Sequence, residues 1–227
     1  MKDERIIQSL QILIESVLII FIVHLLPFYS LSHQHFSELH GPEEILYQTV
    51  FGVFIVSSSF SLMARKHNGG SSKMFLALST ARTLVFSTAS FHFISIILGG
   101  AWFSNFLETL TWAFFMAILS FYRVELVHSG KGSDLLKGTS KNPSVRGIQW
   151  SAIGATIGSW FGAVLLPLDW GEPWQKWPIP LVMGAEVGLF TGALANCCFK
   201  VNCFLSDERE DKIIHNPNIE QTGQQRT

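Results

Sequence analysis

Three ionisable residues inside long apolar stretches, His92, Glu108 and Glu186, are the side chains of this sequence best suited to chemistry. If each stretch is a helix with a rise of ~1.5 Å per residue, each residue lies within about 10 Å of the same membrane boundary. Because ionisable side chains are costly in hydrocarbon, they mark a functional site by default. We expect them to converge in one polar pocket. That pocket would satisfy its own hydrogen bonds, hold a lipid headgroup, or serve catalysis or transport, and the sequence leaves these alternatives open.

Two further charges, Glu15 and Arg82, lie deep in apolar stretches near the opposite boundary. Their depths match, at roughly 12–14 Å from that boundary for a helical rise of ~1.5 Å per residue. Opposite charges at one depth can compensate each other's burial. The sequence therefore predicts a structural ion pair between them.

Neither a metal, a cofactor nor a catalytic constellation is predicted. The sequence has no glycine-rich phosphate loop, no HExxH and no GxSxG,. Clustered histidines can bind zinc, but we interpret those near the first boundary as residues of an exposed polar loop. They are His24, His33, His35 and His40.

The elements that must position these residues are membrane-spanning helices. The chain has 227 residues, of which 48% are hydrophobic and only 15% charged, and its mean hydropathy is +0.32. A span needs roughly 20 apolar residues. Six spans are predicted, near 6–28, 45–64, 74–98, 103–122, 148–166 and 178–199. The expected fold is an all-α polytopic membrane protein, a bundle of six transmembrane helices. The first apolar run exceeds the ~7–15 residues of a signal peptide and is read as a retained helix.

Basic residues predict the orientation, because Lys and Arg in short loops stay on the cytosolic side. They precede the first span, join the second to the third and the fourth to the fifth, and follow the last; the run after the fourth span begins at Arg123. The loop 29–44 has no Lys or Arg, and the loop 167–177 has only Lys176. Both termini are therefore expected in the cytosol and these two loops on the lumenal or extracellular side.

Little of the chain is expected outside the membrane. Residues 1–204 form the transmembrane domain, and 205–227 form a polar cytosolic tail that is predicted to be disordered,. A net charge of −1 does not indicate the basic surface that nucleic-acid binding requires,. Cys197, Cys198 and Cys203 fall at the cytosolic end of the last span, where thiols stay free or are palmitoylated,.

Glycine spacing predicts how the last two spans pack. Helices in lipid approach closely where small residues recur every fourth position. Two such ridges occur, Gly154, Gly158 and Gly162 in the fifth span, and Gly184, Gly188 and Gly192 in the sixth. Because the two spans are antiparallel neighbours, we expect a glycine-zippered hairpin. The alternative is that the ridges face outward and dock the helices of another protein.

The loop joining these spans is rich in Trp and Pro, in the order LPLDWGEPWQKWPIP over residues 166–180. Trp is enriched at the membrane interface and Pro stiffens a turn. Asp169 can cap free backbone amides. The residues expected to present this loop are Asp169, Trp170, Pro173, Trp174, Trp177 and Pro178.

The stretch GSWFGAVLLPLDWGEPWQKWP, residues 158–178, resembles the signature of the phosphatidylinositol-glycan biosynthesis class F family. The resemblance continues more weakly at Phe91-His92, Gly100-Ala101 and 107–109. It departs from the family at Gly171, where a bulkier polar residue is expected, and at Glu172, where a basic residue can stand.

The resemblance implies a subunit of the endoplasmic reticulum membrane without catalytic residues of its own. Such subunits bind and stabilise the enzymes that add ethanolamine phosphate to the mannoses of glycosylphosphatidylinositol (GPI) anchor precursors. The implied partners are those transferases, membrane lipids and the GPI glycolipid precursor, and the loop residues are the implied partner contacts. The alternative is a small transporter or lipid-handling enzyme that uses the pocket of His92, Glu108 and Glu186. A transporter would be expected to show repeated halves with interrupted helices, and no such repeat is visible.

Overall fold

The structure, a computed structural model, describes residues 2–32, 42–65, 72–97, 105–127, 143–168 and 177–215, called the described residues below. Helices fill these ranges almost completely, and no strand occurs within them. The helices are α1 (Lys2–Ser32), α3 (Pro42–Arg65), α4 (Lys73–Ile97), α5 (Phe106–Ala117), α6 (Arg123–Val127), α8 (Pro143–Val164) and α9 (Ile179–His215). A π-helical turn, η1 (Ile118–Tyr122), joins α5 to α6 without a break. The predicted all-α class is confirmed.

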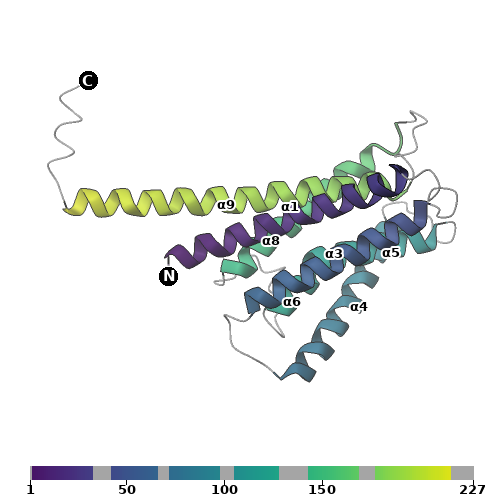
Figure 1. Ribbon diagram of the computed structural model, residues 1–227, viewed down its shortest axis with the longest axis horizontal. Coiled ribbons are helices and arrows are strands. Elements are labelled where there is room, and N and C mark those ends of the chain that lie inside the picture. Colours follow the sequence, from purple (N-terminus) through teal and green to yellow (C-terminus); the bar gives the residue numbers. More distant parts are fainter. Residues whose placement is uncertain are drawn as a thin grey trace.

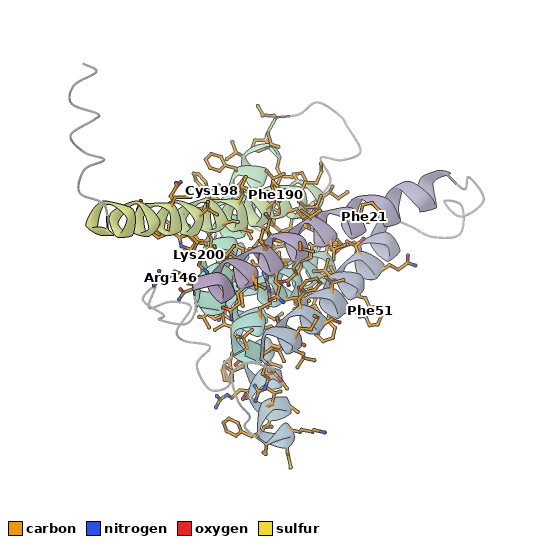
Figure 2. The ribbon with its side chains drawn as sticks, turned by 60° about the vertical axis from the view of Figure 1, so that its left-hand side comes forward. Phe21, Phe51, Arg146, Phe190, Cys198 and Lys200 are labelled. Atoms are coloured by element: carbon orange, nitrogen blue, oxygen red, sulfur yellow. The ribbon has the colours of Figure 1, made fainter. Side chains whose placement is uncertain are left out.

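Four of the helical units are long and apolar enough to cross a membrane. Their qualifying segments are Leu46–Met63, Lys73–Ile96, Phe106–Val127 and Ile179–Cys203. Among the described residues, α1 has a shorter apolar run, Ile6–Phe21. Outward-facing apolar side chains are expected where a protein meets lipid. Phe21 on α1 and Phe51 on α3 are 60% and 65% exposed and project from the bundle (Figure 2). The chain is a polytopic membrane protein; that α1 and α8 also cross stays a prediction.

The helices form two groups that share one core (Figure 1). α1 lies alongside α8 and α9 and also packs against α3, while α3 and α4 lie against the unit α5–η1–α6. That unit is the centre of the bundle, since 78% of Phe106–Val127 is buried, whereas only 22% of Lys73–Ile96 in α4 is. Ile19, Val53, Phe115 and Leu189, from four different helices, are fully buried together in the core.

The central unit is longer than the sequence predicted. The fourth span was expected to end at 122, with Arg123 as the first cytosolic loop residue, but α6 continues to Val127 and Arg123 is fully buried. The expectation was wrong because a charge at the end of an apolar run was read as a loop. Inside the bundle, the charged side chains of α6 have polar partners on other helices, so the helix can continue past them.

The last helix also passes its predicted end. α9 continues to His215, so residues 205–215 of the expected disordered tail are helical, and residues 216–227 lie outside the described residues. An existing helix extends cheaply because nucleation is the costly step. The added segment contains no Gly or Pro before Pro217, and its Glu, Arg and Lys residues have high helix propensity,.

Candidate functional site

The hairpin of α8 and α9 brings the two predicted glycine ridges into contact. A Cβ atom added at Gly158 would overlap the carbonyl oxygen of Gly184 and lie 3.0 Å from the Cα of Gly188. A Cβ atom at Gly188 would overlap the carbonyl oxygen of Gly154, and one at Gly192 that of Trp150. These obstacles are backbone atoms, which cannot move aside independently. The glycine-zippered hairpin is confirmed, with the ridges facing each other.

The same glycines also border an open groove on the outer side of the hairpin. The groove, about 820 Å³, is flanked by apolar side chains such as Ile157, Phe161 and Val187, which are 52%, 61% and 63% exposed. The outward-docking alternative is therefore not needed to explain the glycines, which serve the intramolecular contact. The groove is an apolar surface of the kind that lipid covers.

The end of the tryptophan loop that leads into α9 is anchored to the bundle. The indole Nε1–H of Trp177 donates to Oγ1 of Thr109 on α5 over 3.0 Å, and Pro178 is buried. The ring of Trp177 lies 6.2 Å from that of Trp112, centroid to centroid. Trp112 in turn donates from Nε1 to Oγ of Ser159 on α8, over 3.1 Å.

These contacts join the loop end, α5 and α8 into one indole-hydroxyl network. The network consists of Trp177, Thr109, Trp112 and Ser159 and holds the end of the loop that leads into α9. The other predicted loop residues, Asp169, Trp170, Pro173 and Trp174, lie outside the described residues.

The three ionisable residues of the expected polar pocket occupy different surroundings. His92 on α4 is half-buried, with its ring edge-on to Phe106 at 5.1 Å between centroids. Glu108 on α5 is half-buried, and Glu186 on α9 is fully buried. The cavities described here are lined by none of the three. Within the described residues, no three His, Cys, Asp or Glu side chains are grouped to hold a metal ion. A shared pocket of these three residues stays a hypothesis.

The predicted ion pair between Glu15 and Arg82 is wrong. Glu15 is buried as expected, but its carboxylate pairs with the guanidinium of Arg123 on α6, whereas Arg82 is exposed on α4. Depth along a helix does not tell which way a side chain points around the axis. Arg82 points outward, and the position of Arg123 next to the core was hidden by its place at the end of an apolar run.

Sequence reasoning also missed a second buried carboxylate on α6. Glu125 is 1% exposed and accepts a hydrogen bond from Oγ of Ser79 on α4, over 2.6 Å. On the preceding turn, the hydroxyls of Tyr122 and Ser58 lie 2.8 Å apart and join η1 to α3. The available signal was the pattern RVEL at 123–126, in which two charges alternate with apolar residues directly after the fourth apolar stretch.

The remaining candidates are partly covered by the structure. Cys198 (Figure 2) and Cys203 are exposed on α9 and Cys197 is half-buried, and all three are free thiols. The side chains of His24, His33, His35 and His40 lie outside the described residues.

The fold and site define a class of protein: an all-α polytopic membrane protein built on a glycine-zippered hairpin, with one end of the connecting loop held by the indole hydrogen bond of Trp177. Residues 13–197 match the model of the GPI biosynthesis protein family Pig-F. The chain belongs to this family.

Relatives in several organisms carry the same theme in their names. Over 158 residues the chain is 31% identical to glycosylphosphatidylinositol anchor biosynthesis protein 11 of Debaryomyces hansenii, covering 67% of this chain and 66% of that protein. The protein of the same name from Yarrowia lipolytica is 24% identical over 169 residues, which cover 71% and 74% of the two chains. The human GPI ethanolamine phosphate transferase, stabilizing subunit, is 34% identical over 113 residues, 47% of this chain and 50% of that protein. No solved structure matches the chain.

Proposed function

We propose that this chain is a non-catalytic subunit that binds and stabilises the transferases adding ethanolamine phosphate to the mannoses of GPI-anchor precursors. The proposal is supported by membership of the Pig-F family and by the human relative, whose name is that of a stabilizing subunit. The membrane in which it acts is that of the endoplasmic reticulum, with both termini in the cytosol. Its partners are the transferase catalytic subunits.

The observation that carries the proposal is the anchoring of the loop. A binding edge is strongest when it is rigid before the partner arrives, because less conformational freedom is lost on association. The zippered helices fix the two ends of the loop at a short separation, and the Trp177–Thr109 hydrogen bond holds the end nearest α9. We propose that Asp169, Trp170, Pro173 and Trp174, between these fixed ends, contact the transferase.

Lipids are the second class of proposed partner. The GPI precursor is a membrane glycolipid, so a subunit of the transferase complex lies close to it within the bilayer. His92, Glu108 and Glu186 are the proposed headgroup contacts, from helices α4, α5 and α9.

The experiment is co-purification of the tagged chain with the transferases in mild detergent. Asp169→Ala and Trp174→Ala should lower the recovered transferase while the chain itself accumulates normally. Removal of 216–227 is the control, because that segment follows the end of α9 and should not affect association. Equal recovery of transferase by all of these variants would remove the loop from the proposal.

A further inference from the structure

A cavity of about 460 Å³ lies between α4, α5 and α8, next to the anchored end of the tryptophan loop. Its volume falls within the ~300–1,000 Å³ of small-molecule sites. Trp112 on α5 and Ser159 on α8, both nearly fully buried, lie on its floor. Ile94 on α4 and Trp160 on α8 line it as well and are 45% and 57% exposed, so they mark its rim. The cavity therefore opens sideways, between two helices of the bundle.

Except for the exposed side chain of Asn105 at the start of α5, the polar side chains of the lining are already used within the protein. Trp112 donates to Ser159, and the hydroxyls of Ser95 and Thr156 donate to backbone carbonyls of their own helices. Trp177 closes the loop end with its Nε1–H bonded to Thr109. No Asp, Glu, Lys, Arg or His is among the described residues that line the cavity. Away from Asn105, the walls offer an occupant hydrocarbon and aromatic surface.

This chemistry selects the occupant. Water fills a cavity when it finds two to four polar partners, and apolar cavities stay dry. A lateral opening between spans faces the lipid tails rather than water. We infer that the cavity holds one hydrocarbon chain of a bilayer lipid, which enters between α4 and α8. Retention comes from close contact with the aromatic walls, because a lipid tail gains nothing hydrophobically by leaving other tails.

The inference is independent of the proposed function, since it concerns the chain by itself. It differs from the headgroup proposal in both place and chemistry, because His92, Glu108 and Glu186 do not line this cavity. The indole network then has a second role. Three of its side chains, Trp112, Ser159 and Trp177, also line the proposed lipid-chain site.

The test uses the full-length chain in nanodiscs containing phosphatidylcholine with a photoactivatable diazirine near the end of one acyl chain. After irradiation, cross-linked peptides are located by mass spectrometry. We expect labelling of the floor at Trp112 and Met116, which a chain reaches only through the cavity. Labelling confined to outward-facing residues of α4 and α8, with the floor unlabelled, would overturn the inference.

Substitutions at the mouth separate the cavity from general lipid contact. Thr156→Trp places an indole in the opening and should reduce floor labelling by about tenfold, since overpacking excludes a second group from filled space. Ile157→Trp is the matched control, one residue along α8 and in the outer groove, and should leave floor labelling unchanged. Floor labelling that persists in Thr156→Trp would contradict the inference.

A second cavity-filling variant and a second lipid complete the experiment. If Thr156→Trp fails to give a monodisperse protein, Ala163→Phe fills the cavity from the next turns of α8 and carries the same expectation. Phosphatidylglycerol with the same labelled chain should mark the floor as strongly as phosphatidylcholine, because the walls contact the chain and not the headgroup. Floor labelling by one headgroup class alone would replace a chain site with a headgroup site.

Discussion

The guanidinium of Arg123 on α6 pairs with the carboxylate of Glu15 on α1, and both side chains are buried in the middle of the bundle. A second guanidinium nitrogen of Arg123, Nη1, lies 3.5 Å from Oγ of Ser151 on α8. Arg123 thus links the central helix to both α1 and α8. The pair connects the two groups of helices, and its removal should loosen the whole bundle.

Single substitutions of this pair should be severe. Glu15→Met or Arg123→Met leaves one uncompensated buried charge, a loss expected to cost about 3–5 kcal/mol. The double variant should recover much of that loss, because two apolar side chains need no compensation. Thermal unfolding in detergent measures all three. Arg82→Met is the control, since Arg82 points away from the bundle and its replacement should not lower stability,. A loss in the double variant equal to the sum of the singles would show that the pair does not interact.

Alanine at Gly158 should destabilise the hairpin by ~1–3 kcal/mol, as overpacking does. Its Cβ atom would meet backbone atoms of α9. Gly147→Ala on the same helix is the comparison, because its Cβ atom would meet side-chain atoms of Ile12 and Asn196 rather than backbone atoms. Both changes gain similar helix propensity. Protein yield and unfolding temperature should therefore fall more for Gly158→Ala than for Gly147→Ala. Equal losses in the two variants would mean that the glycine contacts between α8 and α9 do not limit packing.

The hydrogen bond between Trp177 and Thr109 should contribute about 0.5–1.5 kcal/mol, the usual net worth of one such bond. Trp177→Phe removes the donor and keeps most of the aromatic ring, while Thr109→Val removes the acceptor at nearly constant volume. A double-mutant cycle of unfolding free energies should show coupling between the two positions. Additive losses would indicate that the loop end is held by ring packing alone.

Topology can be read with inserted glycan acceptor sites. A site placed within 167–177 should be glycosylated, and one placed within 131–145 should not, as basic residues predict. Arg146 and Lys200 lie near the same end of the α8–α9 hairpin (Figure 2), which agrees with one basic side. Glycosylation of a site within 131–145 would contradict the predicted orientation.

The packing of the hairpin could be predicted because glycines four residues apart share a helix face and the two spans are neighbours in the chain. The burial of Glu15 was predictable for the same kind of reason, from its depth in an apolar run. Its partner was not, because the direction of Arg82 around its helix and the burial of Arg123 depend on which helices become neighbours. That arrangement follows from packing of the whole bundle, including the π-helical turn before Arg123. The aromatic cavity beside Trp112 could not be predicted either, since its walls come from three helices whose arrangement depends on the packing of the whole bundle.

The most direct test of the central claim is to deplete the protein in cells and measure transferase abundance and GPI precursors together. A stabilising subunit predicts that the transferases decline and that precursors lacking terminal ethanolamine phosphate accumulate, with re-expression of the intact chain restoring both. The purified chain alone should transfer no ethanolamine phosphate. Unchanged transferase levels together with an unchanged precursor pool, or transfer by the purified chain unaided, would contradict the account.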